Sequence, residues 1–430
     1  MMSFAAGGLL AAALASGAWL GVTLGLFGLL IFQFQVGGNF SVLSTAVWNT
    51  FNSFALTSIP VFIFLGEVLG ETGIAMRVYN AIAPLFSRLP GGLLQTNIGT
   101  CTLFSAISGS STATAAVVGS VAYEELEQRG YHRAGIVGSI AAGGTLGILI
   151  PPSIPMIIYG SWQDVSIGKL FLAGVLPGIL MAVMFMIYIG IRARLRPAEI
   201  GREDKFVPLG KALIMSMQAW PFLVLILSIL GTTFGGFATP TEAAALGAAT
   251  AILLAALYGQ LTLKRLSNAL RNTTQVFGQI SLILIGAAVL SQAVSLAGIP
   301  KELLAIVAKM NVGPLALLAL VLGLYLVLGC VLTPIEMLLI TLPFVFPLLT
   351  GAGYDPVWLG VMLVIMIEIG LLTPPVGINL FVLMATSKGQ VSLGEAAWAS
   401  LPFWLLQIVM LGLLTMFPQI ALLLPSLMMN

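Results

Sequence analysis

The sequence predicts an all-α polytopic membrane protein in which two inverted repeats each carry a re-entrant helical hairpin and a broken helix. Three observations support this fold class. Only 7% of the 430 residues are charged, whereas soluble domains carry about 25%. Apolar runs long enough to cross a hydrocarbon core of about 30 Å recur along the chain. Two Pro-Pro pairs and two clusters of small polar residues interrupt such runs.

The long apolar runs must be helical, because backbone groups within lipid have to hydrogen-bond inside their own segment. We expect nine full spans. No basic residue precedes Arg77, so the first run is interpreted as a retained span rather than a cleaved signal peptide. The predicted spans cover 5–32, 52–72, 134–159, 167–194, 214–234, 240–259, 274–297, 356–384 and 395–423.

Two other apolar segments are interrupted in the middle and are interpreted as re-entrant hairpins. Small polar residues at 108–114 interrupt the first, and a turn from Gly329 to Pro334 interrupts the second. An amphipathic stretch, typical of a helix that lies along the membrane interface, precedes each hairpin. The hairpins cover 93–126 and 314–349, and the amphipathic stretches cover 76–89 and 300–311.

Positive charge predicts the orientation, because Lys and Arg concentrate on the cytoplasmic side of a membrane. We place the loop from Arg192 to Lys211 inside and let each full span change side. All of the seventeen basic residues except Lys169, Lys301 and Lys309 are then cytoplasmic. The N-terminus is cytoplasmic, the C-terminus is periplasmic, and the two hairpins open to opposite sides. A second cytoplasmic loop holds Lys264, Arg265 and Arg271.

The two halves of the chain resemble each other. The motif Gly147-Ile-Leu-Ile-Pro-Pro152 recurs as Gly370-Leu-Leu-Thr-Pro-Pro375, and glycine turns recur at a shift of 222 to 225 positions. One odd span separates the halves and inverts the second copy, which is the common build of secondary transporters. The predicted units are a first repeat at 1–194, a loop and connector helix at 195–239 and a second repeat at 240–430, with broken helices at 134–159 and 356–384.

The interruptions are the candidate functional sites. Proline breaks a helix, and the freed carbonyl groups are tolerated at membrane depth only where they line a cavity or hold an ion. Hard cations prefer such oxygen ligands, and restarting helix N-termini favour an anionic solute. The oxygen atoms of two candidate Na⁺ sites come from carbonyls beside Gly147, Ile150, Pro152, Gly370 and Thr373 and from the hydroxyls of Ser108, Ser111 and Thr373.

Candidate solute-binding residues lie at the same interruptions. The alternative is that these small residues are packing contacts between helices, and for Thr114 and Asn379 both interpretations stay open. Two intramembrane carboxylates, Glu336 and Glu368, either tune cation or proton binding or face the outer vestibule. The candidate solute-binding residues are Ser110, Thr112, Thr114, Thr333 and Asn379.

The sequence does not indicate an enzyme. Its single histidine, His132, lies in a basic loop, and Walker, dinucleotide and zinc-protease motifs are absent. We expect no nucleic-acid partner; the expected surroundings are a lipid bilayer.

Four motifs together resemble the large membrane subunit of tripartite ATP-independent periplasmic (TRAP) transporters. Because an acidic residue is expected near Thr333 in that family, the nearest one here, Glu336, departs from the pattern. The motifs are Phe104-Ser-Ala-Ile-Ser-Gly-Ser-Ser-Thr-Ala-Thr114, Gly144-Thr-Leu-Gly-Ile-Leu-Ile-Pro-Pro-Ser153, Ser166-Ile-Gly-Lys-Leu-Phe-Leu-Ala-Gly174 and Gly370-Leu-Leu-Thr-Pro-Pro-Val-Gly377.

The resemblance implies a sodium-coupled importer of small organic acids in a bacterial inner membrane. It implies an elevator, with a scaffold and a mobile unit that holds both hairpins. Partners implied are a small four-helix membrane subunit, expected as a separate chain, and a periplasmic substrate-binding protein. It also implies a first sodium site at the 108–111 tip with Gly147, Ile150 and Pro152, and a second with Gly329, Gly370, Thr373 and the carbonyl of Val376.

Two alternatives stay open at this point. One is a stand-alone sodium-coupled anion symporter or antiporter of related fold. The other is a channel or membrane scaffold without coupled transport, which would not need matched broken hairpins.

Overall fold

The computed structural model describes residues 19–201, 208–310 and 312–427, and every regular element in these ranges is helical. Eight helices of the described chain are long and apolar enough to cross a membrane. Seven of them overlap predicted spans, and the eighth is Pro334–Gly351, one arm of the predicted second hairpin. The predicted spans at 5–32 and 356–384 appear as shorter apolar helices, and residues 5–18 lie outside the described ranges.

In the first half, most helix ends fall at residues that the local sequence marks. Gly73 and Gly109 adopt a left-handed conformation (φ +66° and +63°) that other residues rarely tolerate. Ser153 caps a helix by accepting a bond from the backbone N–H of Met156. The helices are α2 Leu20–Ile31, α3 Ser41–Phe51, α4 Ser58–Thr72, α5 Ile74–Phe86, α6 Leu93–Ser108, α7 Ser111–Gln128, α8 Arg133–Leu149, α9 Ile154–Trp162 and α10 Ile167–Leu195.

In the second half, three helices begin with a reciprocal capping box, in which a Ser or Thr and the Glu three residues later satisfy each other's backbone N–H groups. Glu242 is one of these residues, as its position after Thr239 predicts. The helices are α11 Leu209–Ser216, α12 Trp220–Ile226, α13 Thr232–Phe234, α14 Pro240–Leu257, α15 Leu263–Leu296, α16 Ile299–Lys309, α17 Pro314–Gly329, α18 Pro334–Gly351, α19 Pro356–Leu372, α20 Ile378–Thr386, α21 Leu393–Met416 and α22 Gln419–Leu427.

The structure differs from the predicted elements in three places. α15 begins at Leu263, where Thr262 caps it, so Arg271 lies inside a helix and not in the predicted basic loop. α3 forms in a stretch for which no element was predicted. The predicted span 395–423 is interrupted at Phe417 and continues as α22.

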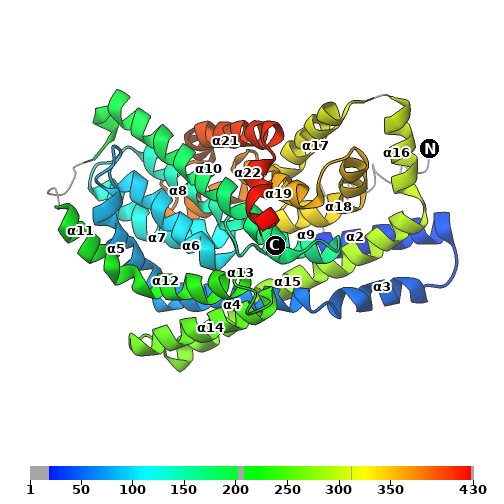
Figure 1. Ribbon diagram of the computed structural model, residues 1–430, viewed down its shortest axis with the longest axis horizontal. Coiled ribbons are helices and arrows are strands. Elements are labelled where there is room, and N and C mark those ends of the chain that lie inside the picture. The colour runs from blue at the N-terminus through cyan, green and yellow to red at the C-terminus, as the bar shows by residue number, and fades with distance from the viewer. Residues whose placement is uncertain (1–18, 202–207, 311, 428–430) are drawn as a thin grey trace.

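The helices form two groups. α2, α3 and α4 pack against α15, and α14 packs against α4; in Figure 1 this group runs along the lower edge. α2 and α15 approach closely because Gly21 and Gly286 have no side chains. A Cβ atom at either position would collide with the backbone of the other helix. Above them in the same view lie α6, α7, α8, α19 and α21, which pack on one another.

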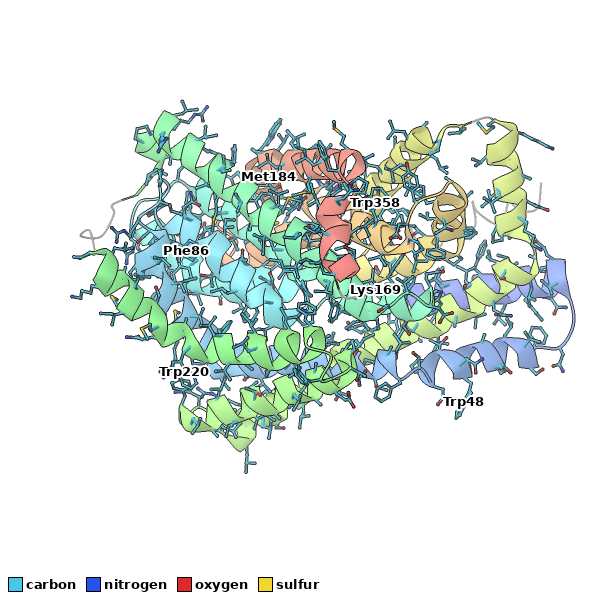
Figure 2. All side chains as sticks on the ribbon, viewed as in Figure 1. Trp48, Phe86, Lys169, Met184, Trp220 and Trp358 are labelled. Carbon is cyan, nitrogen blue, oxygen red and sulfur yellow. The ribbon has the colours of Figure 1, made fainter. Side chains whose placement is uncertain are left out.

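The broken helices are the most deeply buried elements of the second group. Every residue of α8 from Ile136 to Leu149 is buried, and so is every residue of α19 from Trp358 to Leu372. A helix that is buried all round needs an apolar surface all round. Large apolar side chains also cover the outside: Trp48 is 70% exposed and Trp220 is 47% exposed, as expected of a surface that faces lipid (Figure 2).

Candidate functional site

An open cleft of about 1450 Å³ separates the two groups of helices. One wall consists of residues from α2, α4 and α15, and the other consists of the tips of both predicted hairpins together with α20 and the ends of α8 and α9. Segments far apart in the sequence therefore meet here. The polar lining residues are Glu67, Glu71, Ser108, Ser110, Ser111, Thr112, Arg271, Thr274, Gln275, Gln279, Thr333 and Glu336.

The first tip is a compact set of hydroxyl groups. Gly109 lets the chain reverse between α6 and α7, and Ser110 caps α7. The hydroxyls of Ser108 and Thr114 lie 2.8 Å apart, and that of Thr114 also donates to the carbonyl oxygen of Ser110 at 2.8 Å. Ser108, Ser111 and Thr114 are buried, so these oxygen atoms are held in fixed positions.

This tip lies directly on the first helix break. The N–H of Ile154 donates to the carbonyl oxygen of Gly109 at 3.3 Å. Gly147 in α8 leaves no room for a side chain, since a Cβ there would lie 2.5 Å from the Ser110 carbonyl oxygen and 2.7 Å from the Thr114 hydroxyl. The structure thus brings the predicted residues of the 108–114 tip together with Gly147 and Pro152.

The first break itself is buried. The hydroxyl of Ser153 donates to the carbonyl of Ile148 at 2.5 Å, which partly satisfies the end of α8. The side chain of Ile150 packs against Gly178 of α10, and because it is aliphatic, Ile150 can offer a cation only its backbone oxygen. The carbonyl oxygen of Pro152 lies beside Gly109 at the tip, and carbonyl and hydroxyl oxygens are the ligands that hard cations prefer.

Asn379 joins the same region from the second break. Its Nδ2 donates to the Ser111 hydroxyl at 2.7 Å, although the two residues are 268 positions apart in the sequence. Asn379 is fully buried, and its Oδ1 has no hydrogen-bond partner among the described residues. The sequence left packing and function equally open for this residue, and the structure places it at the first tip.

The residues predicted for a second site lie together, but outside the lining of the cleft. A Cβ at Gly370 would lie 2.7 Å from the Cα of Gly329, so α17 and α19 touch through their backbones. The N–H of Val376 donates to the carbonyl oxygen of Cys330 at 3.0 Å. The Thr373 hydroxyl donates to the carbonyl oxygen of Ile369 at 2.6 Å and keeps its lone pairs available.

The structure gives different surroundings to Glu336 and Glu368, the two carboxylates for which the sequence left two roles open. Glu336 accepts a bond from the backbone N–H of Thr333 at 2.7 Å, so it stabilises the start of α18 at the edge of the cleft. Glu368 is fully buried and does not face a vestibule. Its Oε2 accepts a bond from Gln407 at 3.2 Å, and Gln407 also donates to Thr145. Sequence reasoning missed Gln407, since its partner lies in another helix.

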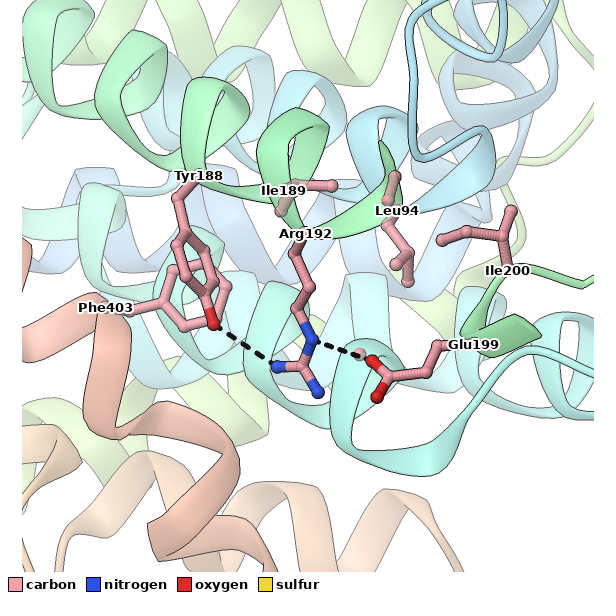
Figure 3. A pocket seen from close by; sticks show the side chains of 9 residues that line it. Leu94, Tyr188, Ile189, Arg192, Glu199, Ile200 and Phe403 are labelled. Carbon is pink, nitrogen blue, oxygen red and sulfur yellow. Dashed lines mark hydrogen bonds and ion pairs between the residues drawn. The ribbon is translucent and has the colours of Figure 1, made fainter. Parts of the chain in front are cut away.

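A second, smaller cavity of about 20 Å³ lies at the end of α10 and is too small for a solute. In Figure 3, Arg192 lies between Tyr188 and Glu199. Its Nε donates to the carboxylate of Glu199 at 2.8 Å. Burial raises the pKa of Glu199, but hydrogen bonds from Arg192 and Arg196 outweigh it and lower the pKa below its usual value. This cluster fixes the segment that follows α10.

The chain has helices of membrane-spanning length around an open cleft, and the turns of two interrupted helical segments line that cleft. These features define a polytopic membrane transport protein. A family model described as "Tripartite ATP-independent periplasmic transporter, DctM component" matches residues 8–420. The chain therefore belongs to this family of TRAP transporter large permeases. The resemblance seen in the sequence is confirmed, and so is the prediction of a transporter subunit rather than an enzyme.

Two relatives and one solved structure illustrate the match. The chain is 34% identical to the C4-dicarboxylate TRAP transporter large permease protein DctM of Pseudomonas aeruginosa, over 94% of each chain. It is 32% identical to the sialic acid TRAP transporter large permease protein SiaM of Vibrio cholerae, over 93% of this chain and 92% of that one. The Alcanivorax borkumensis YdaH transporter shares the fold, with a TM-score of 0.65 at 14% identity over 96% of this chain and 97% of that one.

Proposed function

We propose that this chain imports small organic acid anions together with sodium ions. The main supporting observation is that the hydroxyl groups of the first tip and the Thr333–Glu336 turn of the second tip line one cleft. Hydroxyl and carbonyl oxygens at the first tip suit Na⁺, and the nearby N-termini of α7 and α18 favour an anion. The names of the DctM and SiaM relatives, which refer to a C4-dicarboxylate and to sialic acid, support a small carboxylate as the solute.

The proposed sodium sites are those that the sequence predicts. The first uses Ser108, Ser111 and the backbone near Gly147, Ile150 and Pro152. The second uses the backbone of Gly329, Gly370 and Val376 with the Thr373 hydroxyl. Sodium is a co-transported substrate here and leaves with the solute.

The proposed mechanism is an elevator formed by two inverted repeats. The group around α15 is the scaffold, and the tips with α8, α19 and α20 form the mobile unit. Support comes from the cleft between the groups and from the hydrogen bond that ties the first tip to the second break. The orientation follows the charge distribution, with the N-terminus in the cytoplasm and the C-terminus in the periplasm of a bacterial inner membrane.

The proposed partners are a small four-helix membrane subunit and a periplasmic protein that delivers the solute. The word "tripartite" in the family description supports both. If the binding protein selects the solute, the cleft of this chain needs only to recognise features that the delivered anions share.

The test is uptake of radiolabelled succinate and sialic acid into proteoliposomes under an inward sodium gradient. We expect accumulation of at least one solute only when sodium, the small subunit and the binding protein are all present. Accumulation with sodium and this chain alone would favour the stand-alone symporter. A flux that neither saturates nor accumulates would contradict coupled transport.

A further inference from the structure

α15 presents a row of hydrogen-bond donors to the cleft. Arg271, Gln275 and Gln279 are four residues apart, which places them on one face of a helix, and all three line the cleft and are exposed. From Arg271 to Gln279 the row is about 12 Å long at 1.5 Å per residue. Neither tip nor break contributes to it, and the sequence placed Arg271 in a loop.

The charges in the cleft are unequally matched. Each of its three carboxylates accepts a hydrogen bond: Glu67 from Asn272 at 2.9 Å, Glu71 from Asn268 at 3.3 Å, and Glu336 from a backbone N–H. Arg271 is the single Lys or Arg among the lining residues. No hydrogen bond or ion pair joins its side chain to another residue of the described chain. The cleft therefore offers one cation without an acceptor.

Structural duties on this part of α15 belong to other residues. Thr262 caps the helix, and Arg265 donates to the carbonyl oxygen of Gln260 at 2.7 Å. Asn268 and Asn272 bind α4. An arginine that stabilised the fold would be expected to have an acceptor of this kind, and Arg271 has none among the described residues.

From this geometry we infer that Arg271 and Gln275 form a carboxylate-binding subsite on the α15 wall of the cleft. The guanidinium group donates two parallel bonds to one carboxylate of the solute, and the Gln275 amide donates a further one. The inference rests on the proposed function and deepens it, because it assigns the recognition of the anion to the wall that carries neither tip. A cleft with apolar walls strengthens this attraction.

The test compares Arg271→Gln with Lys264→Gln in the complete transport system. Both changes remove one positive charge from α15, but Lys264 does not line the cleft. We expect Arg271→Gln to raise the KM for succinate or sialic acid at least tenfold, and Arg271→Lys to restore part of this loss. The sodium concentration for half-maximal uptake stays within twofold of the wild-type value. Lys264→Gln keeps the wild-type KM.

Several results would overturn the inference. If Arg271→Gln keeps the wild-type KM, or if both Gln variants lose affinity equally, the guanidinium group does not bind the solute. If the defect appears in vesicles with net-anionic lipids but disappears in vesicles of zwitterionic phosphatidylcholine, Arg271 contacts anionic lipid headgroups instead. Failure of the proposed function gives a different result, because then the wild-type protein itself shows no sodium-driven uptake. Failure of the subsite alone leaves wild-type uptake intact.

Discussion

Single glycines allow close backbone contacts at the helix interruptions of this chain. Gly147 touches the first tip, and Gly329 and Gly370 touch each other across α17 and α19. In each case the absence of a side chain lets one backbone reach another, which is how helices approach most closely in membranes. At Gly147 the space of a missing side chain is taken by the carbonyl oxygen of Ser110, and at Gly329 and Gly370 it is taken by the backbone of the other glycine.

Gly147→Ala tests this contact. The added Cβ would lie 2.5 Å from the Ser110 carbonyl oxygen, so the tip must move, at a cost of about 1–3 kcal/mol. We expect sodium-driven uptake to fall at least tenfold and the thermal midpoint of the purified protein to drop. Gly412→Ala is the control, since a Cβ at Gly412 meets open space and alanine favours the helix by about 1 kcal/mol. Equal activity of the two variants would contradict the proposed role of Gly147.

At the scale of elements, the sequence predicted the helix breaks and tips correctly because their causes are local. Proline pairs end α8 and α19 before them, and Gly109 allows the turn between α6 and α7. The same reasoning missed α3, which packs on α15, and the early start of α15, whose first turns are bound to α4 by Asn268 and Asn272. The bonds of Ser111 to Asn379 and of Glu368 to Gln407 could not be predicted, since no local pattern pairs residues on distant segments.

Asn379 links the first tip to the second break, and we expect this link to couple the two proposed sodium sites. Asn379→Ala removes the bond to Ser111, so each site is expected to fill more independently. The sodium activation curve of uptake should become shallower, with a Hill coefficient that falls toward one and a half-maximal sodium concentration that rises several-fold. Rates measured across a sodium series check this.

Asn97→Ala is the matched control for that experiment. Asn97 is also a buried asparagine that donates to a serine hydroxyl of another helix, at 2.9 Å from Ser139, but it lies away from both breaks. An Asn97 variant that flattens the sodium curve as much as the Asn379 variant would show that the effect follows from lost packing.

At the scale of the whole molecule, the membrane class could be predicted from composition, and the positions of both tips could be predicted from the Gly, Pro and small polar residues that interrupt the apolar runs. The relative placement of the two helix groups could not, because it depends on side-chain contacts between them and on the cleft that they leave open. Arg271 illustrates the difference: its charge is evident in the sequence, but its place on the cleft wall follows only from the extended α15. The inverted repeat and its domain boundaries stay predictions.

An elevator requires the α15 group and the tips to move past each other. A cross-link across the cleft between Ala116→Cys in α7 and Thr274→Cys in α15, both of which line it, should therefore stop uptake, and reduction of a disulfide-forming cross-linker should restore it. Ala116→Cys with Val382→Cys is the control, since α7 and α20 pack within the proposed mobile unit and that pair should transport when linked. The free thiol of Cys330 is first replaced by serine, and Cys101 is left in place because it is buried. Uptake that continues with α7 cross-linked to α15 would exclude the relative motion on which the proposed mechanism depends.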